Sequence, residues 1–203
     1  VHHAQTIIFP NEIRFFSKAR LENCPARFPV SYFNYSFKQT HFVVMEDLSF
    51  ARCGNGQQDG GATYEEAVMI MLWLARLHGH FWGKREQEGS PREVQNFFSG
   101  SDWKTYPLLL KKLYPSAIDV TMSAYPEAFE VMGGAEGPDK VKRAFTGRVL
   151  HLARKLREPP HTLCHGDVKL DNMFFLDAEK PIGDVIGVDW GVCGWSNNAS
   201  DLA

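Results

Sequence analysis

The chain has 203 residues, of which 44% are hydrophobic and 23% charged, enough to bury the core of one domain or of two small lobes. Its formal net charge of −2 gives no electrostatic case for nucleic acid as the main partner, and no apolar run or leading signal pattern points to a membrane. The four cysteines form no CxxC pair, which favours a reduced, cytoplasmic compartment, although an even number is also compatible with a disulfide.

The first predicted elements are a helix and a pair of strands. Asn11 suits the N-cap of the helix, and apolar residues recur after it at helical spacing. Glu12 then falls in the first turn, where the helix dipole favours a carboxylate. Residues 29–37 and 40–46 are rich in aromatic and β-branched side chains, and they predict two strands joined by a short turn.

A glycine-rich stretch and a long helix follow. Residues 53–61 lack the Gly-Lys-Ser/Thr ending of a phosphate loop, so the sequence favours a flexible connection there. Thr63 and Glu66 have the spacing of a capping box, which predicts the start of the helix. Apolar residues occupy almost the whole circumference of this helix, so we expect it at the centre of the fold. His78 and His80 lie near its end, and we expect them to pack or cap rather than to catalyse.

The middle of the chain, residues 84–137, carries a weaker signal and assigns no residue to a site. Its apolar pattern predicts helix interrupted by three prolines, Pro107, Pro115 and Pro126. Asp139 then suits the cap of another helix, whose outward face is basic and is most simply a solvated surface.

The most informative stretch is the polar loop of residues 165–172, which reads HGDVKLDN and follows a short apolar strand. A β-hairpin with its turn near residues 179–183 comes next, and its second arm leads into the triplet Val-Asp-Trp. We therefore expect the oxygen-bearing side chains of Asp167, Asn172 and Asp189 to converge on one site. Such a set can bind a hard cation and supply a base, as phosphoryl transfer requires. Turn capping would explain each of these residues singly, but it does not explain their order.

The ordered set of HGDxxxxN, hairpin, Val-Asp-Trp and Asp-Leu-Ala resembles the catalytic region of the kinase-like phosphotransferases. The nearest resemblance is to the aminoglycoside phosphotransferase, choline kinase and ecdysteroid-kinase-like families, which have His-Gly-Asp where protein kinases have His-Arg-Asp. The resemblance implies Asp167 as the catalytic base and Asn172 and Asp189 as ligands of Mg²⁺. It also implies that His165 and Asp201 support the loop structurally.

The same resemblance implies an ATP site. Glu12 matches the helical glutamate that pairs with the phosphate-binding lysine of the small lobe. Met45, Glu46 and Leu48 match the hinge, where Glu46 and Leu48 would present backbone groups to adenine and Met45 would line its pocket. Lys169 would either contact the transferring phosphate or balance the neighbouring carboxylates, and the sequence leaves both readings open.

The implied fold is α+β and protein-kinase-like, with two lobes in one domain. Residues 1–48 would form a truncated small lobe of short antiparallel strands and one helix, together with the hinge. Residues 49–203 would form a mostly helical large lobe that carries the catalytic loop and its hairpin. These 203 residues contain neither the glycine-rich loop and phosphate-binding lysine expected before Glu12 nor the large-lobe helices expected after Ala203. We therefore expect a fragment that binds ATP weakly and turns over poorly when isolated.

The implied reaction is the Mg²⁺-dependent transfer of the ATP γ-phosphate to a hydroxyl of a small-molecule acceptor. The His-Gly-Asp motif and the arrival of Asp201 so soon after Trp190, without an activation segment, favour this over a protein kinase. The alternative is a non-catalytic kinase-like module that binds nucleotide or regulates; the intact Asp167, Asn172 and Asp189 favour the enzyme. Neither nucleic acid nor a membrane is expected as a partner. The acceptor and the oligomeric state stay open.

Overall fold

The computed structural model describes residues 10–17, 21, 23–38, 40–55, 61–85, 87–88, 105–127, 134, 136–176 and 184–202. The chain packs into two units. Val1–Phe97 and Glu158–Ala203 form what we call the mixed unit, and Phe98–Arg157 form the helical unit. This division differs from the predicted lobe boundary at residue 48, which stays a prediction. Within the described residues, no helix has the length and apolarity needed to cross a membrane.

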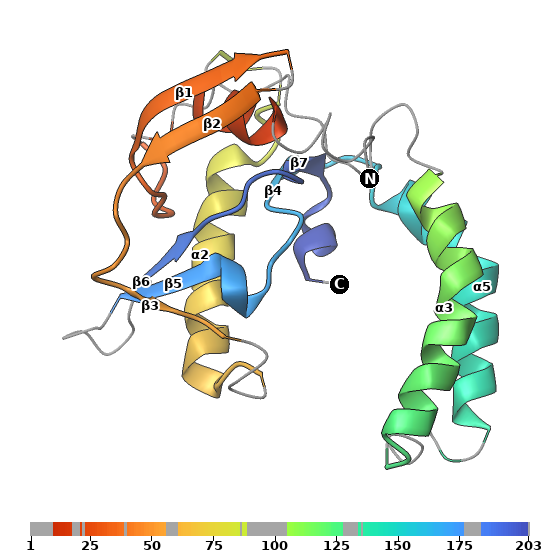
Figure 1. Cartoon of the computed structure of the whole chain (residues 1–203). Helices are drawn as coiled ribbons and strands as arrows, with labels where there is room; N and C mark the ends of the chain where they lie inside the picture. Colours follow the sequence, from red (N-terminus) through yellow and green to blue (C-terminus); the bar gives the residue numbers. More distant parts are fainter. Residues whose placement is uncertain are drawn as a thin grey trace. The chain divides into compact units, whose positions relative to one another are not determined.

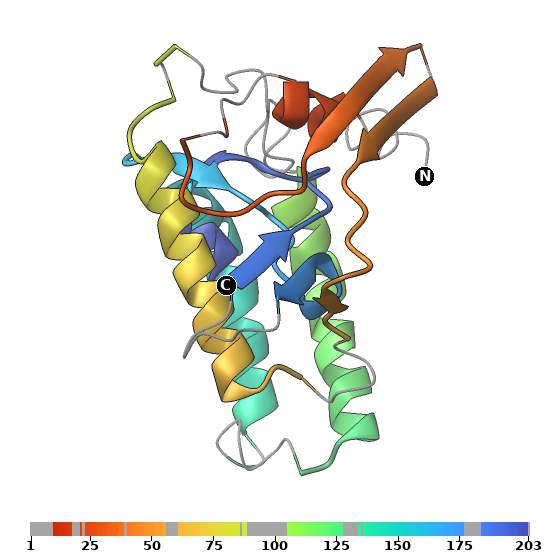
Figure 2. The same ribbon diagram turned by 90° about the vertical axis from the view of Figure 1, so that its left-hand side faces the viewer.

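The mixed unit begins with a short helix over residues 10–17 and an antiparallel hairpin of β1 (Ser31–Phe37) and β2 (Thr40–Met45), seen side by side in Figure 2. The two strands confirm the predicted pair. One face of the hairpin carries aromatic rings at alternate positions, as a strand period of two requires. Tyr35 and Phe42 stack across the pair with ring centroids 5.1 Å apart.

Helix α2 (Tyr64–Phe81) starts with the predicted capping box. The Thr63 hydroxyl accepts the Glu66 N–H at 3.2 Å, and the Glu66 carboxylate accepts the Thr63 N–H at 2.8 Å. The expectation of a central helix holds for one face only, because Met71 and Leu72 are 49% and 37% exposed. The strands β4 (Thr162–Cys164) and β6 (Asp184–Gly187) contact α2, and its buried positions fall on the face that carries Trp73.

Strands from the second half of the chain pack on α2 (Figure 1). β4 (Thr162–Cys164) pairs with β7 (Gly194–Ser196), while β3 (Arg52–Cys53), β5 (Met173–Leu176) and β6 (Asp184–Gly187) form a three-stranded sheet in the order β3-β5-β6. The antiparallel β5–β6 pair confirms the predicted hairpin; its turn lies outside the described residues, as does most of the glycine-rich stretch.

The core of the mixed unit is aromatic. Its largest fully buried side chains are Trp73, Trp190, Phe15, Phe81 and Phe175. Trp73 lies directly over Gly187 of β6, where an added Cβ would come within 2.5 Å of the indole ring. The close approach of helix and strand therefore depends on glycine at this position.

The helical unit is a pair of helices, α3 (Thr105–Ala124) and α5 (Gly137–Lys155), that run side by side in Figure 1. The rings of Tyr114 and Phe145 stack between them with centroids 3.8 Å apart. The predicted helix break at Pro115 is wrong, because α3 continues through this residue. A proline inside a helix removes one backbone hydrogen bond. Helix α3 nevertheless stays unbroken, and it packs against α5.

The start of α5 also differs from the prediction. Glu136 occupies the N-cap, and Pro138 stands in the first turn, where proline is favoured because its missing N–H has no helical partner. Asp139 therefore lies inside the first turn and is not the cap. Its carboxylate is still placed favourably near the positive end of the helix dipole.

The observed architecture is the predicted α+β mixture of helices and small antiparallel sheets. Every residue assigned to a site from the sequence lies in the mixed unit.

Candidate active site

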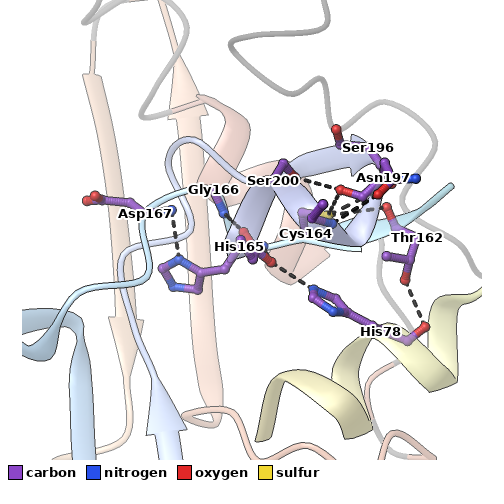
Figure 3. A network of polar contacts seen from close by, with 11 residues as sticks. His78, Thr162, Cys164, His165, Gly166, Asp167, Ser196, Asn197 and Ser200 are labelled. Carbon is purple, nitrogen blue, oxygen red and sulfur yellow. Dashed lines mark hydrogen bonds and ion pairs between the residues drawn. The ribbon is translucent and has the colours of Figure 1, made fainter. Parts of the chain in front are cut away.

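A buried aspartate anchors the loop that follows β4. Asp201 ends the short helix η2 (Asn198–Asp201), and its side chain is fully buried. One carboxylate oxygen accepts the backbone N–H of His165 at 2.8 Å, and the other accepts that of Gly166 at 2.7 Å. His78 donates from Nε2 to the same carboxylate at 2.8 Å; Figure 3 shows its ring reaching from α2 toward the loop. These donors compensate for the loss of hydration of the buried charge.

His165 is fully buried and joins two backbone segments. Its Nε2 lies 2.8 Å from the carbonyl oxygen of Val188, and its Nδ1 lies 3.3 Å from the backbone nitrogen of Asp167. A carbonyl can only accept and an N–H can only donate, so the ring is the neutral Nε2–H tautomer. Burial lowers the pKa of His165, in keeping with this neutral form. The ring therefore ties the Asp167 loop to the strand end before Asp189.

Gly166 is required by the local backbone. Its φ is +84°, in the region that favours glycine, and an added Cβ would lie 2.5 Å from the carbonyl oxygen of Val192. The loop and the turn that contains Val192 are therefore in direct contact, with no room for a side chain between them.

Asp167 projects from this loop, and Figure 3 shows its carboxylate directed away from His165. Its Oδ2 accepts hydrogen bonds from Lys169 Nζ at 2.8 Å and from Asn172 Nδ2 at 3.0 Å. The Asn172 amide also donates to the Asp167 carbonyl at 2.9 Å, which closes the loop. Asp167 is 37% exposed, and the described residues make no hydrogen bond to its Oδ1. One oxygen of this partly exposed carboxylate is therefore held by two hydrogen bonds, and the other has no hydrogen bond from the described residues.

Lys169 is half exposed, and its hydrogen bond to Asp167 raises the pKa of the ammonium group. This geometry corresponds to the reading in which Lys169 balances a carboxylate. Whether it also contacts a phosphate stays a prediction.

Asn172 and Asp189 are brought together by the backbone. Asn172 lies in η1 (Leu170–Asn172), and its carbonyl accepts the N–H of Val188 at 3.0 Å. Asp189 follows with φ +62°, a left-handed conformation that is uncommon except for glycine, Asn and Asp and that often marks functional positions. Among the described residues, no hydrogen bond reaches the Asn172 Oδ1 or the exposed Asp189 carboxylate. Two hard oxygen donors without a protein partner fit Mg²⁺.

Glu12 lies on the other side of the same segment. Its carboxylate accepts the backbone N–H of Trp190 at 3.2 Å. Burial raises the pKa of Glu12, the Trp190 N–H lowers it, and the nearby charge of Asp189 raises it again. The helix of residues 10–17 is thus tied to the residue after Asp189, and the pairing of Glu12 with a phosphate-binding lysine stays a prediction.

Asn11 was missed as a site residue, and its prediction as an N-cap is wrong. It lies within the helix, is 1% exposed, and donates from Nδ2 to the carbonyl oxygens of Gly191 at 3.1 Å and Cys193 at 2.9 Å. One sequence signal could have found it: Asn11 is four residues before the apolar Phe15, so both share a helix face.

The predicted hinge follows β2. Glu46 uses its backbone N–H to bond the Val30 carbonyl at 2.7 Å, and its carboxylate accepts the Val30 N–H at 3.1 Å. Asp47 caps the next turn by accepting from Ser49. Within the described residues, the Glu46 carbonyl and the Leu48 N–H have no backbone hydrogen bond, and none joins the hinge to the Asp167 loop. Their contact with adenine stays a prediction.

A second cluster lies beneath the loop, where His78, Cys164 and Asp201 bring three potential metal-ligand atoms within 4.8 Å of one another. Burial strongly raises the pKa of the Cys164 thiol, which keeps it protonated. Its sulfur lies 3.5 Å from the Asn197 carbonyl (Figure 3), while the Asp201 oxygens accept the donors described above. The cluster is thus a hydrogen-bonded support. All four cysteines are free.

The α+β fold, the His-Gly-Asp loop anchored by a buried aspartate and the hairpin that leads to Asp189 define a kinase-like protein. The model of the ecdysteroid kinase-like family matches residues 2–203, and the chain belongs to this family. The family match also shows the predicted kinase-like fold class. No curated protein matches the chain.

Proposed function

We propose that this protein is a phosphotransferase that moves the γ-phosphate of ATP to a hydroxyl group of a small molecule. The observation that carries the proposal is the arrangement around Asp167: Lys169 and Asn172 hold one oxygen of this partly exposed carboxylate, and the described residues make no hydrogen bond to the other. Membership in a kinase-like family supports the same conclusion.

In this proposal Asp167 accepts the proton of the acceptor hydroxyl as its oxygen bonds to phosphorus. The hydrogen bonds to Oδ2 fix the orientation of the carboxylate, so Oδ1 is presented in one direction. Lys169 lies beside this carboxylate and could contact the transferring phosphate with its ammonium group, at the cost of its present hydrogen bond.

Asn172 and Asp189 would hold Mg²⁺ through the Oδ1 atom and the carboxylate. When bound, Mg²⁺ offsets the charge that develops on the phosphate oxygens. The contribution of the chain would be to hold the two segments that carry these side chains, through the Val188–Asn172 hydrogen bond and the hydrogen bond from Trp190 to Glu12.

The adenine edge would be bound at the hinge. The Glu46 carbonyl is an unused acceptor and the Leu48 N–H an unused donor within the described backbone, which supports this assignment. Met45 would contribute an apolar surface. A cytoplasmic location is also part of the proposal, supported by the four free thiols.

The test follows Mg²⁺-dependent ADP release by the full-length protein against a panel of steroid, amino-alcohol and sugar hydroxyls. The Asp167→Asn variant should lose acceptor-stimulated release. Asp171→Asn is the matched control, since it removes an exposed carboxylate from the same loop, and it should keep release. If nucleotide binds but no acceptor stimulates release, the non-catalytic kinase-like module becomes the better description.

A further inference from the structure

The turn of residues 190–193 connects the Asp189 segment to β7. The Cys193 N–H donates to the Trp190 carbonyl at 3.3 Å, which closes the turn. The turn directly follows the left-handed Asp189, so any displacement of the turn also moves the Asp189 carboxylate.

One side of this turn is held by Asn11. The two N–H groups of an amide can serve two acceptors, and here the acceptors are the carbonyl oxygens of Gly191 and Cys193. The side chain is buried, so no water competes for these bonds. No other side chain of the described residues donates to these two carbonyl oxygens.

The opposite side of the turn rests on the catalytic loop. The Val192 carbonyl oxygen would lie only 2.5 Å from a Cβ added to Gly166, the residue before Asp167. A close-packed contact of this kind allows little relative movement. The turn therefore fixes the position of Asp189 relative to the loop that holds Asn172.

We infer that Asn11 is a positioning residue that sets the Asp189 carboxylate against Asn172 and thereby the affinity of the site for a divalent cation. The inference rests on the proposed function, because it assumes that these two side chains hold the metal. Residues that orient metal ligands from outside the coordination sphere typically change metal affinity by about 10- to 100-fold when replaced, and we expect about tenfold for Asn11.

The experiment measures Mn²⁺ binding to the full-length protein by electron paramagnetic resonance, with a saturating non-hydrolysable ATP analogue. Asn11→Asp keeps the size of the side chain but places carboxylate oxygens against the two carbonyl oxygens, which repel them. Asn11→Ala removes both donors. Thr162→Val is the matched control, because it deletes a buried hydrogen bond, from the Thr162 hydroxyl to the His78 carbonyl at 2.8 Å, without touching the turn. Thermal unfolding without ligand is recorded for each variant.

The Mn²⁺ dissociation constant should rise about tenfold in both Asn11 variants and stay at the wild-type value in Thr162→Val, at similar losses of melting temperature. An unchanged dissociation constant in Asn11→Ala overturns the inference. So does failure of both Asn11 variants to fold, since the side chain would then serve the fold alone. If wild type itself binds no Mn²⁺ with nucleotide, the proposed function fails, which is a distinct result.

Discussion

The rings of Phe15 and Trp190 stack face to face, with centroids 3.9 Å apart and planes 4° from parallel. Both side chains are fully buried, and the contact joins the helix of residues 10–17 to the residue after Asp189. The side chains of Glu12 and Asn11 link the same two segments by hydrogen bonds to backbone groups of residues 190–193. Helix and candidate metal segment are therefore one packed assembly.

Replacing Phe15 by alanine should reduce the free energy of unfolding by about 3–5 kcal/mol, because it removes a buried ring and leaves a cavity. Urea denaturation measures the loss. Phe33→Ala is the control: this ring is 52% exposed, and its removal should change stability by only about 0.5 kcal/mol. Equal effects for the two variants would contradict the packing described for Phe15.

Gly166→Ala should destabilise the protein by roughly 1–3 kcal/mol or more, since it combines a left-handed backbone with a clash against the Val192 carbonyl. Gly79→Ala provides the comparison, because Gly79 lies in α2 and a Cβ added there would meet no neighbouring atom within 4 Å. That change should stabilise by about 0.5–1 kcal/mol, as alanine is preferred over glycine inside a helix. Thermal unfolding of both variants tests the contrast.

Asp201→Asn should cost about 3–5 kcal/mol of stability, because the new amide nitrogen would face N–H donors that now bond a buried carboxylate. Acceptor-stimulated ADP release should fall as the loop loosens. Asp119→Asn removes a solvent-exposed partner of Lys142 and should cost no more than about 1 kcal/mol. A stable Asp201→Asn variant would show that the loop does not depend on this anchor.

Stability should decrease as the pH falls below about 6.5, the ordinary value for histidine. The folded-state pKa of His165 is lowered by burial, so between that pKa and 6.5 the unfolded chain binds more protons than the native one. The free energy of unfolding then falls by up to about 1.4 kcal/mol per pH unit. His80 also lowers the stability as the pH falls, because burial lowers its pKa too.

The His165→Gln variant isolates this effect, since it retains the contribution of His80. The raised pKa of Glu12 has the opposite effect on stability at pH values above 4.5, the ordinary value for glutamate. Glu12 is also retained in His165→Gln, so its contribution is the same in both proteins. Denaturant titrations between pH 5 and 7 should show a shallower slope for His165→Gln than for wild type. Parallel curves would exclude a neutral, buried His165 as the cause.

Lys169→Met should leave stability nearly unchanged, because the ion pair with Asp167 is half exposed and such pairs contribute about 0–1 kcal/mol. If the ammonium contacts the phosphate during transfer, kcat should fall roughly 100-fold, the usual cost of losing one charge-stabilising donor. A shift of the pH–rate profile without that fall would instead indicate that Lys169 only balances Asp167. Steady-state kinetics at several pH values separates the two readings.

The features predicted correctly from the sequence are those whose cause is local. The Thr63–Glu66 capping box is a matter of spacing within four residues, and the β5–β6 hairpin follows from alternating apolar runs around a turn. The exposure of Met71 and the uninterrupted helix at Pro115 depend on what packs against each helix, which residue type alone does not specify.

The candidate site shows the same division. The order of Asp167, Asn172 and Asp189 along the chain predicted a shared location, and the Val188–Asn172 hydrogen bond accounts for it. Asn11 was assigned to a cap because Asn favours caps, whereas its partners lie about 180 positions away. No local pattern encodes so distant a hydrogen bond.

The anchoring of the loop by Asp201 has a consequence for synthesis on the ribosome. Chains emerge from their N-terminus, and a contact can form only when both of its partners have left the exit tunnel. The hydrogen bonds from His165 and Gly166 to Asp201 therefore cannot form before residue 201 has emerged, and those of Asn11 cannot form before residues 190–193 have emerged. A nascent chain stalled before residue 201 would therefore hold Asp167 in a loop that lacks its anchoring carboxylate.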